Sequence, residues 1–166
     1  RIGIGLQAEK RYGCGLVFLP RDDNQRRLYM HRFEEVIRQE DQQFLGWRRM
    51  PVDSTALGLL ARQREPAIQQ IFIGRGPGIA DTAHFERKLL VIRKVMERFV
   101  RESGLSQASF FHVPSLSCRT LVYKGMLLAD QIHDYFPDLS HPDMVSALAL
   151  VHQRYSTNTF PTWDLA

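Results

Sequence analysis

The stretch IQQIFIGRGPGIADTAHFERKLLVIRKVMERFVRE, residues 68–102, places a strand, a loop and a helix in direct succession. Residues 68–73 form a short isoleucine-rich run, which predicts a buried strand. Asp81 is expected to cap a helix that continues to about Glu102. One stripe of that helix is apolar at three- and four-residue spacing: Phe85, Leu89, Ile92, Met96 and Phe99. The stretch therefore indicates a fold that mixes α-helices and β-strands.

The segments on either side continue this alternation. Strands are predicted at residues 12–19, 44–52, 109–113, 119–124 and 145–155. A helix is predicted from an N-cap among residues 22–24 to about Asp41, with an apolar face of Tyr29, Phe33, Val36 and Ile37. A short helix is predicted over residues 127–135, followed by a turn at 141–143. A length of 166 residues suits one domain with a hydrophobic core.

Composition and charge are those of an ordinary globular protein, with 44% apolar and 24% charged residues. The net charge is +4, but the cations alternate with acidic residues, which is typical of solvated helix faces; we expect no nucleic-acid partner. The longest apolar run, residues 144–151, is too short to cross a membrane, and residues 1–10 do not resemble a signal peptide. Cys14 and Cys118 stand far apart, so neither a disulfide framework nor a zinc site is expected, and a cytoplasmic location follows.

Four patterns invite a chemical interpretation but have little support. Residues 74–78 (GRGPG) follow a strand, but a dinucleotide-binding loop needs a glycine where Ile79 stands. Cys14-Gly15 is typical of an N-terminal cysteine nucleophile, yet that chemistry needs the cysteine at residue one, and the apolar surroundings predict an inert thiol. A carboxylate pair is a weak hypothesis for three aspartates spaced by four, Asp130, Asp134 and Asp138, and the six histidines have no metal-site spacing.

A stronger candidate follows the apolar run at residues 147–151, which ends abruptly in His152-Gln-Arg-Tyr-Ser-Thr-Asn-Thr159. A buried strand that delivers a guanidinium, hydroxyls and an amide at its end is typical of a binding-site rim. Arg154 could clamp a carboxylate with two hydrogen bonds, and Ser156 and Thr157 could complete the set. A polar strand exit without function remains the alternative on these residues alone.

Residues 152–160, HQRYSTNTF, resemble the Arg-aromatic-small-Thr segment that class II glutamine amidotransferases carry at the end of an inner strand. The stretches at 115–139 and 146–166 resemble the amidotransferase domain of the glutamate synthase branch in particular. The sequence YKGM at 123–126 and the ending STNTFPTWDLA are specific to that branch. The upstream stretches at 12–22, 44–53 and 68–76 share its character, so the resemblance covers nearly the whole chain.

The resemblance implies an α+β fold, the N-terminal-nucleophile hydrolase sandwich of four αββα layers with antiparallel sheets. It implies that glutamine amide hydrolysis supplies ammonia for glutamate synthesis from 2-oxoglutarate. Arg154 would hold the α-carboxylate of L-glutamine, with Ser156 and Thr157 beside it and Tyr155 shaping the pocket. In the parent enzyme the resemblance implies FMN, an iron–sulfur cluster, a flavin synthase domain and either an electron donor subunit or ferredoxin. The location would then be the cytoplasm, or the plastid stroma in a eukaryotic phototroph.

Two departures from the family pattern shape the expectation. The family nucleophile is an N-terminal cysteine, whereas this sequence begins with Arg1, and Cys14 falls where the family has an aliphatic residue. The family's oxyanion-forming Asn-Gly pair lies beyond a segment like residues 163–166. We therefore expect residues 1–166 to be one partial domain, the central part of the amidotransferase domain, with no catalytic residue, no cofactor and no metal of its own. A non-catalytic glutamine-binding or regulatory module is the alternative, and a hydrolase that uses Cys14 is a weaker one.

Overall fold

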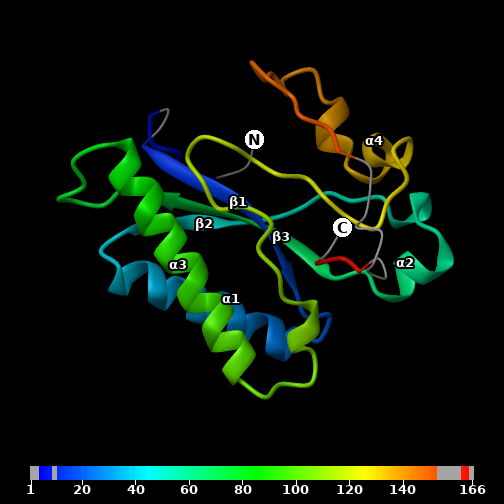
Figure 1. The fold of residues 1–166 in the computed structure, drawn as a ribbon, viewed down its shortest axis with the longest axis horizontal. Helices are drawn as coiled ribbons and strands as arrows, with labels where there is room; N and C mark the ends of the chain where they lie inside the picture. Colours follow the sequence, from blue (N-terminus) through cyan, green and yellow to red (C-terminus); the bar gives the residue numbers. More distant parts are fainter. Residues whose placement is uncertain (1–3, 9–10, 153–161, 165–166) are drawn as a thin grey trace. The chain divides into compact units, whose positions relative to one another are not determined.

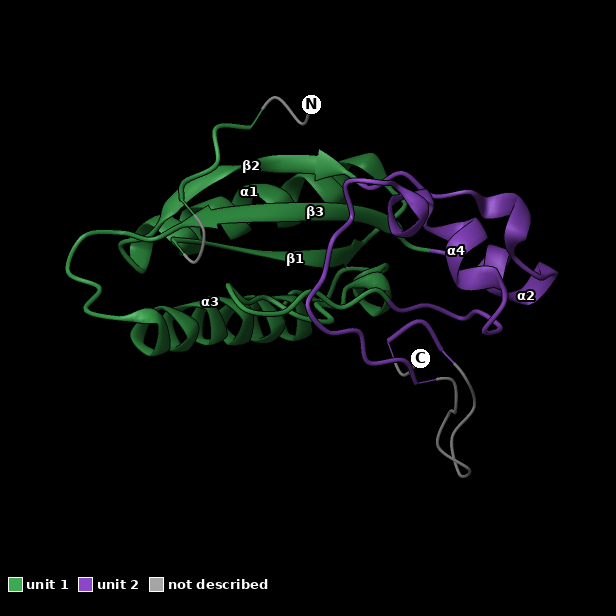
Figure 2. Ribbon diagram, turned by 90° about the horizontal axis from the view of Figure 1, so that it is seen from above, with its two compact units in different colours: residues 1–49, 66–123 green, residues 50–65, 124–166 purple. Residues whose placement is uncertain are grey.

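The computed structural model describes residues 4–8, 11–152 and 162–164, and its residues fall into two compact units. Unit 1 comprises residues 1–49 and 66–123, and unit 2 comprises residues 50–65 and 124–166 (Figure 2). Each unit thus combines segments that are distant in the sequence. The main elements, labelled in Figure 1, are β1 (Tyr12–Leu19), α1 (Asp23–Gln39), β2 (Gln43–Arg49), α2 (Leu59–Gln63), β3 (Ala67–Gly74), α3 (Thr82–Glu102) and α4 (Gln131–Tyr135).

The three strands of unit 1 form an antiparallel sheet in the order β1-β3-β2. Cys14 lies opposite Phe72 on β3, and Trp47 of β2 lies opposite Ile71. A bulge between Phe44 and Gly46 turns both Phe44 and Trp47 toward the helices. The strands predicted at 12–19 and 68–73 are confirmed. The one predicted at 44–52 ends earlier, at Arg49, because Pro51 has no backbone N–H for a ladder.

The helices α1 and α3 pack against one face of this sheet, as Figure 1 shows. Asp22 caps α1 by accepting a hydrogen bond from the Gln25 backbone N–H, and Asp81 caps α3 in the same way from His84. All four residues of the predicted apolar face of α1 are buried. On α3 the predicted stripe is confirmed except at its end, where Val100 is buried and Phe99 is only partly buried. The core between helices and sheet contains Val17, Leu19, Phe33, Ile71, Leu89, Ile92 and Met96.

The opposite face of the sheet is also apolar and buried. Leu16 and Phe18 of β1 have no exposed surface, and Ile68 and Phe72 of β3 are 5% and 4% exposed. Gln70 is the buried polar residue on this face, and its side-chain oxygen accepts a hydrogen bond from Arg48 at 3.1 Å. Both faces of β1 and β3 are therefore apolar and buried, whereas β2 is only partly buried.

Residues 112–117 run antiparallel along the free edge of β1. Backbone bridges join Cys14 to Ser117 and Phe18 to His112, with one extra residue between the bridges on the outer segment. The extra residue brings the Ser115 carbonyl to 1.9 Å from where a Cβ on Gly15 would lie, so only glycine fits there. The strand predicted at 109–113 is wrong: residues 108–110 form a 3-10 turn. The strand predicted at 119–124 is also wrong, because in the described chain no strand lies beside it to complete a ladder.

Unit 2 contains the short helices α2 and α4. The predicted helix at 127–135 is confined to α4, because the chain first turns at Gly125, whose carbonyl accepts a hydrogen bond from Leu127. The predicted turn at 141–143 is confirmed by the bond from the Met144 backbone N–H to the His141 carbonyl.

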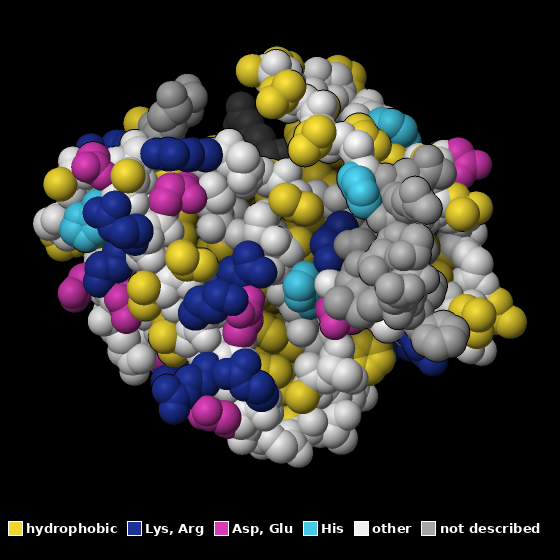
Figure 3. All heavy atoms as spheres, viewed as in Figure 1, with side chains coloured by type: hydrophobic (Ala, Val, Ile, Leu, Met, Phe, Trp, Pro, Cys, Tyr) yellow, Lys and Arg dark blue, Asp and Glu magenta, His cyan; other side chains and the backbone are white. Residues whose placement is uncertain are grey.

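The strand predicted at 145–155 is wrong over residues 145–152, and residues 153–155 lie outside the described part of the chain. Val145 and Leu150 are 87% and 95% exposed, so the apolar run is not buried as expected. Figure 3 shows apolar side chains gathered at the tip of this segment, which Figure 1 draws in orange. A strand takes its hydrogen bonds from a neighbour, and no described strand pairs with this segment.

The mixed charges on α1 and α3 pair within one helical turn, as expected. Arg32 contacts Glu35 at 2.8 Å, and Arg93 contacts Glu97 at 2.7 Å. Figure 3 shows basic and acidic side chains interspersed on the face of the molecule turned to the viewer. In the described ranges, no helix combines the length and the apolar character needed to cross a membrane.

Candidate functional site

The four predicted substrate-binding residues, Arg154, Tyr155, Ser156 and Thr157, lie outside the described residues. Their role therefore stays a prediction. The structure describes the chain on both sides of the segment at 153–161: His152 before it is exposed, and Thr162, Trp163 and Asp164 follow it. These flanking residues and their contacts in unit 2 are what the structure describes around the predicted binding segment.

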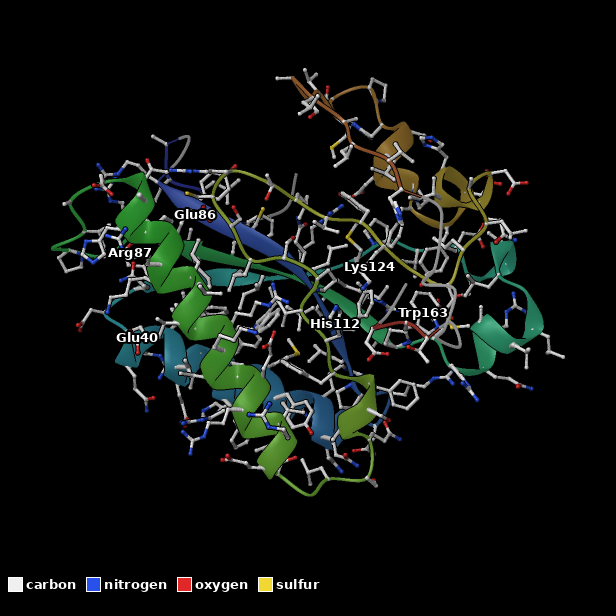
Figure 4. All side chains as sticks on the ribbon, in the orientation of Figure 1. Glu40, Glu86, Arg87, His112, Lys124 and Trp163 are labelled. Atoms are coloured by element: carbon white, nitrogen blue, oxygen red, sulfur yellow. The ribbon has the colours of Figure 1, made fainter. Side chains whose placement is uncertain are left out.

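Trp163 anchors the chain directly after the predicted binding segment. Its side chain is 6% exposed, and its indole Nε1–H donates to the Ala61 carbonyl of α2 at 3.0 Å. The ring centroid lies 5.7 Å from that of Tyr135 on α4. A buried indole with a hydrogen-bonded N–H and an aromatic neighbour holds the backbone at residues 162–164 in place. Figure 4 labels Trp163.

The turn at Lys124-Gly125 completes the surroundings of Trp163. A Cβ on Gly125 would lie 2.8 Å from Cζ3 of the indole, so the ring occupies the space that any larger residue needs. Lys124 donates from Nζ to the Asp164 carbonyl at 2.8 Å. The Thr162 hydroxyl donates to Oδ1 of Asp164 at 2.6 Å, which closes a tight turn around the tryptophan. The sequence drew attention to residues 123–126 only because they resemble the family. No sequence pattern predicted that Trp163 would be buried against them.

A second contact network holds α4 in unit 2. The Tyr135 hydroxyl donates to Oε1 of Glu65 at 2.7 Å, and the Ser54 hydroxyl donates to the same oxygen at 2.8 Å. The backbone N–H of Asp53 donates to the Tyr135 carbonyl at 3.0 Å. Burial, then the hydrogen bond and charge of Glu65, raise the pKa of Tyr135 far above its ordinary range. The tyrosine is therefore a neutral hydrogen-bond donor at every physiological pH.

Neither cysteine has the surroundings of a nucleophile. Burial raises the pKa of Cys14 to about 11. The pKa of Cys118 is also raised to about 11, by burial and by its hydrogen bond and repulsion with Glu86. Catalytic thiols need a depressed pKa and a cationic neighbour or helix N-terminus. The structure supports the expectation that Cys14 is an inert thiol.

Glu86, labelled in Figure 4, fixes the loop that follows the edge segment. Its carboxylate accepts hydrogen bonds from the Ser117 hydroxyl at 2.9 Å and from the Cys118 backbone N–H at 2.7 Å. The Ser117 oxygen in turn accepts from the backbone N–H groups of Arg119 and Thr120. The sequence carried no signal for this role, since Glu86 read as one of several surface charges on α3.

The glycine loop at 74–78 has a structural role. The Gly76 backbone N–H donates to Oε1 of Gln42 at 3.0 Å, so it is not available to a phosphate. A Cβ at Gly76 would lie 1.7 Å from the Asp41 carbonyl, which explains the glycine by close packing. The rejection of a dinucleotide site is thus supported by geometry. Among the described residues, no group of three His, Cys, Asp or Glu side chains is placed to hold a metal ion, and the three aspartates near α4 form no such group.

Comparison with known proteins identifies the class. The family model for class II glutamine amidotransferases matches residues 1–166, and the chain belongs to that family. Within it, the chain is 42% identical over 163 residues to the large chain of the NADPH glutamate synthase of Bacillus subtilis, which covers 98% of this chain. It is 39% identical over 94% of its length to ferredoxin-dependent glutamate synthase 2 of Synechocystis. It is 37% identical over its full length to the NADH glutamate synthase of Schizosaccharomyces pombe.

The chain spans about a tenth of the length of these relatives: 10% of the Bacillus and Synechocystis proteins and 8% of the yeast protein. The resemblance to the glutamate synthase branch is thus confirmed over nearly the whole chain. The relatives are named for three electron donors, and identity to them differs by only a few per cent. The similarity therefore does not distinguish between donors.

Proposed function

We propose that this chain is the glutamine-binding part of the glutaminase domain of a glutamate synthase large chain. The observation that carries the proposal is the segment at 152–159 within a sequence that matches the amidotransferase family from end to end. The burial of both faces of β1 and β3 supports a place for this sheet inside the four-layer αββα sandwich. On this proposal residues 1–166 are the central part of one domain.

The reaction divides into two steps. Glutamine and water give glutamate and ammonia through a thioester on a cysteine. Ammonia then reaches 2-oxoglutarate, and two electrons and two protons reduce the adduct to a second glutamate with loss of water. This chain contributes to the first step by holding the substrate. Arg154 would bind the α-carboxylate through two charge-assisted hydrogen bonds, with Ser156 and Thr157 beside it and Tyr155 forming the pocket wall.

The nucleophile and the redox groups are proposed to lie outside these residues. Both cysteines have a raised pKa, which does not suit thioester formation. An iron–sulfur cluster is usually held by four cysteine thiolates, and the sequence has only two cysteines. FMN and the cluster are therefore assigned to a flavin synthase domain of the parent chain, which takes electrons from a donor subunit or from ferredoxin. Bacterial and chloroplastic relatives support a location in the cytoplasm or the plastid stroma.

A non-catalytic glutamine-binding or regulatory module is the second candidate. The absence of an activated thiol among residues 1–166 favours it for the chain alone, since such a module would bind glutamine without hydrolysing it. Sequencing the gene on both sides discriminates the two: an upstream Cys-Gly start and a downstream Asn-Gly segment favour the enzyme.

The test of the proposal is Arg154→Lys in the full-length protein. Lysine keeps the charge but cannot form the two-pronged pair, which should cost about 1.5–3 kcal/mol of binding free energy, or roughly 10- to 150-fold in the KM for glutamine. Glutamate synthesis from added ammonia should fall far less than synthesis from glutamine. The matched control is Arg101→Lys at an exposed position on α3. Equal loss of both activities in Arg154→Lys would mean that Arg154 is structural.

A further inference from the structure

We propose that the exposed face of α3 is a docking surface for an acidic segment of the parent chain outside residues 1–166. The inference rests on the proposed function, because it takes the chain as part of a glutamate synthase large chain. It goes beyond that function by naming a surface distinct from the predicted glutamine-binding residues and the chemistry of the segment that covers it. Figure 2 shows α3 along the outer side of unit 1.

The helix α3 has two faces of different chemistry. The face that packs into the core consists of Phe85, Leu89, Ile92, Met96 and Val100. Residues 87, 90, 91, 94 and 98 recur at three- and four-residue spacing on the opposite face, and all five are exposed. We call these five residues the outer face of α3: Arg87, Leu90, Val91, Lys94 and Arg98.

The centre of the outer face is apolar. Leu90 and Val91 are 52% and 41% exposed. A single aliphatic side chain on a surface needs no explanation. Two adjacent ones in the middle of a regular helix leave apolar area that a partner would remove from water, and that removal favours association.

The rest of the outer face is basic, and its carboxylate neighbours lie only at its borders. Lys94 contacts Glu97 at 2.7 Å, and Arg98 contacts Glu102 at 3.0 Å. Glu97 is shared with Arg93, also at 2.7 Å. The helix has six Lys and Arg residues against three Glu, a net charge of +3 in a chain whose net charge is +4. Exposed ion pairs within a helix contribute little, so the carboxylates of a partner can replace them.

These features fit a protein surface that presents carboxylates around an apolar centre. Carboxylates complement the cations, and aliphatic side chains cover Leu90 and Val91. A membrane fits less well, because an interfacial helix inserts its large apolar face, and that face of α3 lies in the core. A nucleic acid also fits less well, since its phosphates would lie against two aliphatic side chains.

The parent chain is the source of this surface that the comparisons favour. The residues span 10% of the Bacillus and Synechocystis relatives, so about nine-tenths of such a protein lies elsewhere. A segment of the same chain stays near α3 through covalent linkage. The resulting high effective concentration allows even a small surface to be occupied.

The experiment is photo-crosslinking in the purified full-length protein. Leu90 is replaced by p-benzoylphenylalanine, which on illumination bonds to whatever lies against it, and mass spectrometry identifies the linked peptide. We expect a peptide of the same chain, outside residues 1–166, that is rich in Asp and Glu. The matched control is the same replacement at Leu28, which is 47% exposed on the neighbouring helix α1 and should not link to that peptide.

Charge variants test the chemistry of the contact. In the protein with the cross-linker at position 90, Arg87→Glu should lower the yield of the link about fivefold, because repulsion replaces attraction. Arg87→Lys keeps the charge and should change the yield less than about twofold. Circular dichroism of both variants checks that the helices remain folded. Equal yields in the two variants would mean that charge does not govern the contact.

The other contrary outcomes are as definite. The docking surface is wrong if position 90 gives no link, if the linked peptide has no excess of acidic residues, or if Leu28 gives the same link. Mixing isotope-labelled and unlabelled protein shows whether the link joins two copies, which would also overturn the proposal. None of these results depends on glutamine. The proposed function fails separately, if Arg154→Lys leaves the KM for glutamine unchanged.

Discussion

Tyr135 donates its hydroxyl hydrogen to Glu65 across 2.7 Å, although the two residues are 70 positions apart in the sequence. The bond joins the two segments that make up unit 2, residues 50–65 and 124–166. Ser54 donates to the same carboxylate oxygen, so Glu65 is the acceptor that ties the first segment to α4. Tyr135 also supports the ring of Trp163.

Tyr135→Phe should lower the free energy of unfolding by about 1.5–3 kcal/mol, because a part-buried hydrogen bond to a carboxylate oxygen is lost while the ring contacts remain. Urea denaturation of the wild-type and variant proteins measures the difference. Ser54→Ala removes the more exposed of the two bonds to Glu65 and should cost less. A Tyr135→Phe protein as stable as the wild type would mean that this bond contributes nothing.

The two thiols should be unreactive in the folded protein. A rise of the pKa from 9.0 to about 11 lowers the thiolate fraction about 100-fold at neutral pH. Alkylation followed by mass spectrometry at pH 7.5 should show slow labelling of both cysteines, and fast labelling after unfolding in urea. A thiol-reactive glutamine analogue should leave Cys14 unmodified. Rapid, selective modification of Cys14 would instead support the hydrolase hypothesis that uses it.

The same shifts predict a loss of stability at alkaline pH. Above about pH 9 the unfolded chain releases thiol protons that the folded chain retains up to about pH 11. Because the unfolded state then binds fewer protons, the free energy of unfolding falls as the pH rises from 9 to 11. Urea denaturation at steps of one pH unit checks this. Cys14→Ala should flatten the dependence, and an unchanged slope in that variant would contradict the assignment.

Gly15→Ala should destabilise unit 1 by about 3 kcal/mol or more. The added Cβ would lie 1.9 Å from the Ser115 carbonyl oxygen, and backbone on both sides of the contact cannot yield cheaply. Thermal unfolding followed by circular dichroism measures the change. Gly58→Ala is the control, because its new methyl group meets nothing within 4 Å; as the N-cap of α2 it should change the stability by no more than about 1 kcal/mol.

Asp41→Gly should stabilise the protein by about 1 kcal/mol. Asp41 follows α1 with a φ of 57°, and the bonds from Asp41 to Arg38 and from Gln42 to Ile37 form the hydrogen-bond pattern that usually ends in glycine. Asp41→Ala, which keeps the strain without the polar side chain, should not stabilise. Denaturation midpoints of the two variants give the comparison, and a less stable glycine variant would show that the aspartate side chain outweighs the strain.

Local patterns predicted the two long helices, α1 and α3, and the strands β1 and β3 well, but they missed α2. The apolar spacing of α3 and the caps at Asp22 and Asp81 are short-range features, so the sequence alone was sufficient to place them. The predicted strands at 109–113 and 119–124 were wrong, and so was the described part, 145–152, of the one predicted at 145–155, because an apolar run becomes a strand only where a partner supplies hydrogen bonds. Local sequence contains no information about that partner.

The candidate site divides in the same way. The sequence by itself determined the family, because a family match depends on residue identities in a fixed order. For the same reason the segment at 152–159 predicted glutamine as the ligand. Only the tertiary structure decided which residues surround the anchor at Trp163 and why position 125 must be glycine. Those contacts join α2, α4 and the turn at Gly125 across 102 positions at the longest, and close packing over such a separation has no signature in the local sequence.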